Sequence, residues 1–207
     1  MTQYNNKGGQ CGACETCGKC SSRDIANCPE GITPYTIITY SENFAGILNQ
    51  ITAVFTRRQV NIESLNVCAS STPGVHKYTI TCFCTEETVQ LITKQIEKKI
   101  DVLQARYYTA DQIYIQEVAL FKLSTPKLLE QPEISRTIRQ HSAKIVEVNE
   151  TYSIVTLTGL PEDIDSLYAS LDSFDCVLQF VRCGAIAVTK NRRELLDEYL
   201  ENLSLEH

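Results

Sequence analysis

The sequence predicts an α+β protein built from two tandem ferredoxin-like domains, each with the element order β-α-β-β-α-β and with two helices on one face of an antiparallel sheet. Three observations predict this fold. Strand-like alternation and helical spacing of apolar residues follow each other in that order in the first half of the chain. The same order returns in the second half, although the sequence itself does not repeat. The 207 residues, 43% of them hydrophobic, are enough for two small packed cores.

The expected first domain spans residues 34–109. It starts with β-branched and aromatic residues, which predict a strand. From Gly46 onward apolar residues recur at helical spacing, and a second helix begins near Glu86 with acidic residues that complement the helix dipole. In order, the expected elements are strand 35–40, helix 46–58, strands 62–70 and 76–84, a second helix from residue 86, and strand 102–107.

The expected second domain spans residues 117–190 and follows a polar link over 109–116. Pro132 predicts a break or a late start in its first helix, because proline disrupts a helix interior, and Pro161 suits the first position of its second helix. In order, the expected elements are strand 117–123, helix 128–140, a hairpin of 144–149 and 152–158, helix 162–171, and strand 178–188 interrupted at Gly184. A charged helix is expected over 191–204, and residues 205–207 resemble the start of a purification tag.

Charge and composition exclude several classes of protein. A net charge of −6 and a pI near 5.2 argue against a nucleic-acid partner held through phosphates. No apolar run approaches the ~18–20 residues of a membrane span, and the first residues do not form a secretory signal, so a cytoplasmic protein is expected. No phosphate-binding glycine motif or zinc-protease motif occurs in the sequence, and His76 and His141 have no nucleophile near them in sequence. The sequence therefore predicts a protein without catalytic residues of its own.

Ten cysteines fall into two groups. Five lie in a tail over residues 1–33, four of them separated by two residues, a spacing at which thiolates chelate zinc or an iron–sulfur cluster. A disordered tail with redox-labile thiols and a set of disulfides are the alternatives, since the tail has no apolar core. The candidate metal ligands are Cys11, Cys14, Cys17, Cys20 and Cys28. The other five are expected to be small buried residues in strands: Cys68, Cys82, Cys84, Cys176 and Cys183.

The first strand is expected to lead through a short loop directly into the first helix. Free backbone N–H groups and the positive helix end then point at one place, which suits a small anion such as a carboxylate. Gly46 has no Cβ, so a polar ligand group approaches the backbone there, and Asn43 offers a side-chain amide. A plain strand–loop–helix corner without a ligand fits these residues as well.

The motif Glu42-Asn43-x-x-Gly46-x-Leu48, followed by Arg58-x-x-Asn61-Ile62-Glu63-Ser64-Leu65, resembles the opening of the regulatory (small) subunit of acetolactate synthase. The resemblance continues over residues 35–190 and includes Lys98-Lys99-Ile100-Asp101-Val102 and Lys144-Ile145-Val146-Glu147-Val148. That subunit begins with an ACT domain, a ligand-binding module of amino-acid metabolism. The cysteine-rich tail lies outside the resemblance.

The resemblance implies a non-catalytic regulatory subunit that activates a catalytic subunit and confers feedback inhibition by valine or another branched-chain amino acid. Thiamine diphosphate, magnesium and FAD would then belong to the catalytic (large) subunit. It also implies a homodimer through the ACT domains with the effector at the seam. The loop of one chain, with Asn43, Phe44, Ala45, Gly46 and Ile47, would hold the carboxylate and amino group, and Asn61 and Ile62 of the other chain would come near.

Two other functions remain open from the residues. One is a metal-binding or redox module centred on the cysteine tail, with the two domains as its scaffold. The other is an amino-acid sensor of ACT type that serves a different client protein. Metal content distinguishes the first, and the identity of the co-purifying partner distinguishes the second.

Overall fold

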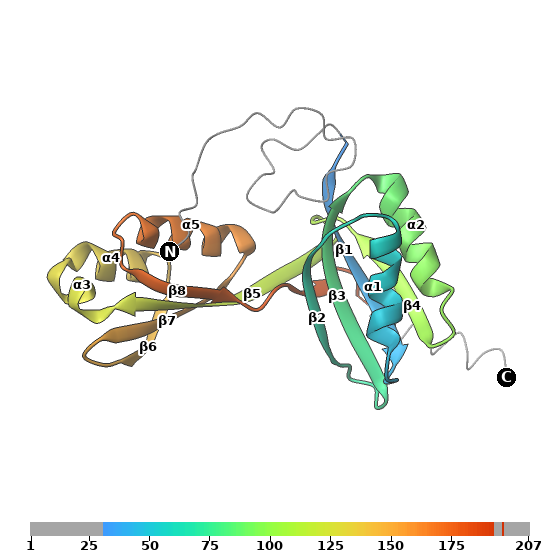
Figure 1. Cartoon of the computed structure of the whole chain (residues 1–207), viewed down its shortest axis with the longest axis horizontal. Coiled ribbons are helices and arrows are strands. Elements are labelled where there is room, and N and C mark those ends of the chain that lie inside the picture. The colour runs from blue at the N-terminus through green and yellow to red at the C-terminus, as the bar shows by residue number, and fades with distance from the viewer. Residues whose placement is uncertain (1–30, 193–195, 197–207) are drawn as a thin grey trace.

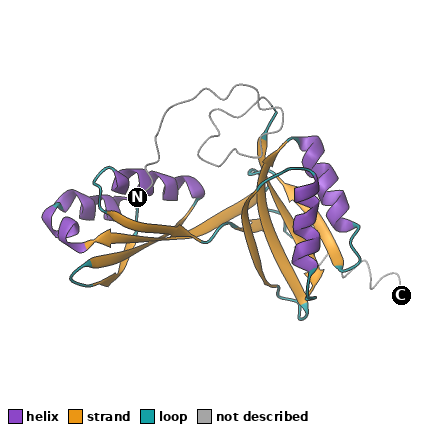
Figure 2. Ribbon diagram, in the orientation of Figure 1, coloured by secondary structure: helices purple, strands orange, loops and turns teal. Residues whose placement is uncertain are grey.

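A computed structural model describes residues 31–192 and Leu196. Three of the expected features lie outside the described residues: the five tail cysteines, most of the C-terminal helix, and residues 205–207. Within them the chain forms two antiparallel sheets, each with its helices on one face, as the sequence predicted (Figure 1; Figure 2). No helix in this described part is long and apolar enough to cross a membrane.

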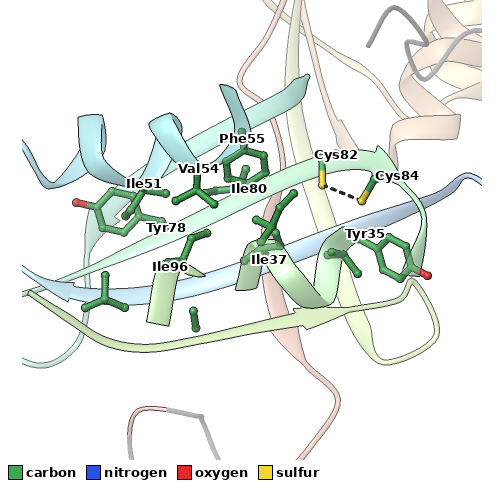
Figure 3. Packing of buried hydrophobic residues seen from close by; sticks show 14 of the residues in the cluster. Tyr35, Ile37, Ile51, Val54, Phe55, Tyr78, Ile80, Cys82, Cys84 and Ile96 are labelled. Atoms are coloured by element: carbon green, nitrogen blue, oxygen red, sulfur yellow. Dashed lines mark hydrogen bonds between the residues drawn. The ribbon is translucent and has the colours of Figure 1, made fainter. Parts of the chain in front are cut away.

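The first domain has the predicted β-α-β-β-α-β order and the sheet order β2-β3-β1-β4. Its helices α1 and α2 pack on one face over a core that includes Ile37, Phe55, Ile80 and Ile96 (Figure 3). Thr85 caps α2 by accepting a hydrogen bond from the Thr88 N–H, which fixes where that helix begins. The elements are β1 (Thr33–Glu42), α1 (Ile47–Arg57), β2 (Ile62–Ala69), β3 (Val75–Cys84), α2 (Glu86–Glu97) and β4 (Val102–Tyr108).

The second domain repeats that order with the sheet β6-β7-β5-β8. The predicted break at Pro132 is confirmed, because one helix ends at Glu130 and the next begins at Pro132. Pro161 occupies the first position of α5, as predicted. The elements are β5 (Ile113–Ser124), α3 (Thr125–Glu130), α4 (Pro132–Gln140), β6 (Lys144–Val148), β7 (Tyr152–Gly159), α5 (Pro161–Asp172), β8 (Val177–Arg182) and β9 (Ile186–Thr189).

The segment between the domains differs from the expected polar link over 109–116. Strand β5 already begins at Ile113, and its first residues pair with β9 in the register Ile113↔Thr189 to Gln116↔Ile186. The final strand, expected over 178–188, is two strands, because Gly184 adopts a left-handed φ of 77° and redirects the chain from β8 to β9. Strand β5 therefore pairs with β9 at its start and with β7 and β8 further on.

The face of the first sheet opposite its helices is covered in part. Ile38 and Tyr40 of β1 and Tyr108 of β4 are buried there against Ile113, Ala187 and Leu196. A ferredoxin-like sheet leaves this face open in isolation, and here residues from β5, from β9 and from position 196 cover part of it. The two domains are thus joined by a small apolar core as well as by the chain itself.

Candidate ligand-binding site

The predicted ligand loop lies between β1 and α1 and is fixed at its beginning by backbone hydrogen bonds. The Glu42 N–H donates to the Asp101 carbonyl at 3.0 Å, and the Asn43 N–H donates to the Gly74 carbonyl at 2.9 Å. Residues 43–46 are exposed, whereas Ile47 is buried and anchors the first turn of α1 in the core. The loop therefore presents four consecutive exposed residues from a rigid base.

Gly46 stands at the N-cap of α1 with a left-handed φ of 93°, a conformation that favours glycine. A Cβ built on Gly46 meets nothing within 4 Å, so the space beside its backbone is open. Among the described residues no side chain caps this helix start, and its first turn, Ile47-Leu48-Asn49, contains no acidic residue. The positive end of the helix dipole is therefore left uncompensated there, and a carboxylate is a suitable ligand for it.

The structure does not bring the whole predicted site together within one chain. Asn43 to Ile47 lie at the start of α1, whereas Asn61 and Ile62 follow its end. Helix α1, whose 11 residues begin with Ile47, lies between the two groups and extends over about 16 Å along its axis. Asn61 is exposed and Ile62 half-buried against the first core. A site that uses both groups needs a second chain.

Strand β2 is one edge of the first sheet. Its C-terminal half is exposed, including Val67 and Cys68, and Phe44 and Leu48 at the candidate loop are exposed apolar residues. Edge strands present unpaired backbone groups, which invite another strand to pair with them. The open edge and the exposed loop are features of the same domain that suit an association between two copies.

A second concave feature lies between the domains. This interdomain cavity has a volume of about 430 Å³ and is lined from both sides, by Tyr35, Ser64, Leu65 and Phe83 of the first domain and by Glu117, Asp165, Arg182 and Gly184 of the second. At its wall Arg182 binds two carboxylates: its Nη2 lies 2.6 Å from Glu117 Oε2, and its Nη1 lies 3.0 Å from Asp165 Oδ1. The cavity thus adjoins a partly buried ionic cluster at the junction, in which Glu117 is the buried member.

The sequence interpretation missed this cluster. Glu117 and Arg182 are far apart in the sequence, and neither belongs to a motif. One signal was present: Glu117 continues the inward-facing row of Ala119, Phe121 and Leu123 on β5, where a carboxylate is out of place without a cation.

The strand cysteines separate into two classes, and the prediction that all five are buried was wrong. Cys82, Cys84 and Cys176 are buried, whereas Cys68, on the edge strand, and Cys183, at the β8–β9 joint, are exposed. The contact with Cys84, whose Sγ lies 4.0 Å away, and burial both raise the pKa of the Cys82 thiol (Figure 3). No group of three or more metal-ligating side chains occurs within residues 31–192.

Comparison with known proteins gives one consistent answer. The profile described as "Small subunit of acetolactate synthase" matches residues 116–191, and the profile described as "AHAS small subunit-like ACT domain" matches residues 37–104. The chain is 30% identical to the probable acetolactate synthase small subunit of Methanothermobacter thermautotrophicus, over 74% of this chain and 91% of the relative. It is 33% identical to the acetolactate synthase small subunit of Bacillus subtilis, over 73% of this chain and 88% of the relative.

A solved structure shares the fold of both domains. The crystal structure of the acetolactate synthase small subunit from Thermotoga maritima superimposes with a TM-score of 0.70 and covers 78% of this chain and 99% of its own, at 23% identity. The match spans both halves of the described chain, so it supports the tandem arrangement as well as the single domain.

Proposed function

The chain belongs to the family of acetolactate synthase small subunits, and from this we propose that it activates the catalytic subunit of that enzyme and makes it sensitive to feedback inhibition by a branched-chain amino acid, foremost valine. In this proposal thiamine diphosphate, magnesium and FAD are bound by the catalytic subunit. The observation that carries the proposal is the open, uncapped start of α1 at Gly46, in the loop where an amino-acid carboxylate is expected.

The effector would bind through its polar head and its side chain. Its carboxylate would accept hydrogen bonds from the backbone at the start of α1, and the Asn43 amide would contact the carboxylate or the ammonium group. A carboxylate at a helix start contributes up to ~2 kcal/mol, each charge-assisted hydrogen bond about 1.5–3 kcal/mol, and the buried aliphatic side chain about 1.5–3 kcal/mol. After the cost of association is subtracted, the expected free energy of binding is about −4 to −8 kcal/mol, which corresponds to a dissociation constant in the micromolar to millimolar range.

The proposal includes a symmetric homodimer through the first domains. Pairing of two first sheets would satisfy the exposed edge of β2. It would also supply Asn61 and Ile62 of a second copy to the loop of the first, which one chain cannot do across the length of α1. The binding site and the dimer are therefore expected to depend on each other.

Calorimetry with valine, leucine and isoleucine on the full chain tests the site. Asn43→Ala and Gly46→Asp are expected to abolish binding and feedback inhibition while activation of the catalytic subunit persists, because the aspartate would place a second carboxylate where the effector's carboxylate is expected. Gly31→Asp is the matched control, since Gly31 has a similar left-handed φ of 90° and the same open space around its backbone. Unchanged inhibition in both loop variants would contradict the assignment of the site.

The client protein is tested separately. Capture of the tagged chain from its native cell extract is expected to bring down the acetolactate synthase large subunit. Capture of a different enzyme in its place, with valine still binding, would favour a sensor for another client.

A further inference from the structure

The side chain of Ser64, on β2 of the first domain, forms a hydrogen bond with the joint between β8 and β9. Its Oγ accepts a hydrogen bond from the Ala185 N–H at 3.3 Å and lies 2.7 Å from Thr81 Oγ1 on the neighbouring strand. The adjacent Gly184 passes so close that a Cβ on it would lie 3.1 Å from the Ser64 Cβ. The hydroxyl of Ser64 thus ties the first sheet to the second domain.

A β-bulge turns Ser64 towards that joint. Strand β2 pairs with β3 as Ile62↔Cys82 and then as Ser64↔Thr81, so Glu63 has no residue of its own opposite it. Regular alternation would place Ile62 and Ser64 on the same face. The extra residue instead lets Ile62 and Leu65 pack against the first core while Ser64 faces the second domain.

The bulge at Glu63 lies between the expected effector seam and the hydrogen bond to the second domain. Before it stand Asn61 and Ile62, the residues that a second copy would contribute to the effector site. After it stands Ser64 with its hydrogen bond across the junction. Residues 61–63 adjoin Ser64 directly in the chain, so no other element separates the expected effector seam from the Ser64 hydroxyl.

The joint between β8 and β9 is connected to the rest of the second domain through Arg182. Gly184 and Ala185 follow Arg182 after one residue, Cys183, and the Arg182 guanidinium is held by Glu117 at 2.6 Å and by Asp165 on α5 at 3.0 Å. The joint is thus attached to β5 and α5 through a partly buried ionic cluster, of which Glu117 is the buried member. The interdomain cavity beside Ser64 and Gly184 leaves space into which the joint can move.

We propose that Ser64 and the β2 bulge at Glu63 couple effector binding to the position of the second domain, with Ser64 as the positioning residue. This inference rests on the proposed function, because it takes the effector seam at Asn61 and Ile62 as its input. Effector binding orders β2 and tightens the Ser64–Ala185 hydrogen bond, and the second domain passes the change to the catalytic subunit. Coupling of this kind requires a contact that differs between the free and the bound state, and this hydrogen bond is that contact.

The test is hydrogen exchange on the full-length chain with and without saturating valine, combined with calorimetry. In the wild type valine is expected to slow exchange in residues 43–48 and also at the Ala185 amide. In Ser64→Ala valine should bind within about twofold of its wild-type dissociation constant and still slow exchange in 43–48, while the response at Ala185 is lost. A purely structural role of Ser64 would lower protection with and without valine alike.

Two further variants sharpen the result. Gly184→Ala forces a Cβ against Ser64 and is also expected to remove the response at Ala185, from the other side of the contact. Ser170→Ala is the matched control, because the Ser170 hydroxyl donates only to the Ser166 carbonyl of its own helix, so the response should stay as in the wild type.

The outcomes separate the two proposals. Protection of 43–48 with no change at Ala185 in the wild type would overturn the coupling and leave the effector site intact. A retained Ala185 response in Ser64→Ala would overturn the role of Ser64. Absence of binding of valine, leucine and isoleucine alike in calorimetry would overturn the proposed effector site, and the coupling with it.

Discussion

Replacement of Arg182 by methionine is expected to destabilise the second domain strongly. The Arg182 guanidinium donates to Glu117 through Nε at 2.7 Å and Nη2 at 2.6 Å, and the Glu117 side chain is only 7% exposed. Arg182→Met leaves the Glu117 carboxylate buried without its cation. Breaking a buried pair in this way costs about 3–5 kcal/mol.

The expected magnitude is large enough to measure directly. Since urea slopes for small domains are about 1–3 kcal/mol/M, the unfolding midpoint should fall by roughly 2 M. Circular dichroism is the suitable probe, because the chain contains no tryptophan. The double variant Glu117→Gln/Arg182→Met removes both charges and is expected to recover most of the loss, since the remaining amide is neutral.

The exposed pair Lys127–Asp175 is the control. Its nitrogen and oxygen lie 2.7 Å apart, but the Asp175 side chain is 98% exposed, so Lys127→Met should leave the midpoint nearly unchanged. If Arg182→Met behaves like Lys127→Met, the reasoning from burial is refuted. If the double variant is no more stable than the single one, the loss is due to packing of the arginine and not to the unpaired carboxylate.

Two further predictions concern titratable groups. Alkylation of the folded protein at pH 8, followed by mass spectrometry, should modify the exposed Cys68 and Cys183 faster than the buried Cys82 and Cys176. Burial raises the pKa of Cys176, and the contact with Cys84 together with burial raises the pKa of Cys82. Equal alkylation rates in the native state would contradict this prediction, and urea should remove the difference in rate. The hydrogen bond and the charge of Lys127 lower the pKa of Asp175. The contribution of this pair to stability is therefore present above the ordinary aspartate pKa and is lost as the pH falls through the lowered pKa. An NMR titration of Asp175 should show the lowered midpoint, and Lys127→Ala should return that midpoint to the ordinary range.

Local patterns were sufficient to predict most of the secondary structure. The helical spacing of Ile51, Val54 and Phe55 identified α1, and these side chains form the core of the first domain. The prolines at 132 and 161 fixed helix starts because their effect on the backbone is local. The two-domain arrangement followed from the order of such elements.

Features that depend on distant pairing were not predicted. Strand β5 begins earlier than expected because β9, more than seventy residues later, pairs with its start. The exposure of Cys68 and Cys183 depends on which strand lies at an edge and where the chain turns, and neither is encoded near the cysteine itself. The Glu63 bulge also results from pairing, since a single strand has no register until its neighbour is placed.

For the candidate site, sequence motifs located the loop but not the reason that it stays open. The left-handed backbone of Gly46 and the missing cap at α1 are visible only in the structure. Asn61 and Ile62 were assigned to the same site through a resemblance, and the distance along α1 makes their joint use a question of how two chains assemble.

The apolar contact of Ile38 and Tyr40 with Ala187 has a consequence for folding of the chain during its synthesis. A ribosome releases the first sheet long before residue 187, so this apolar surface of the nascent first domain stays incompletely covered until β9 has been synthesised. Truncation before β9 should therefore yield a fragment that aggregates. A chaperone that covers this apolar surface during translation would protect the growing chain from aggregation.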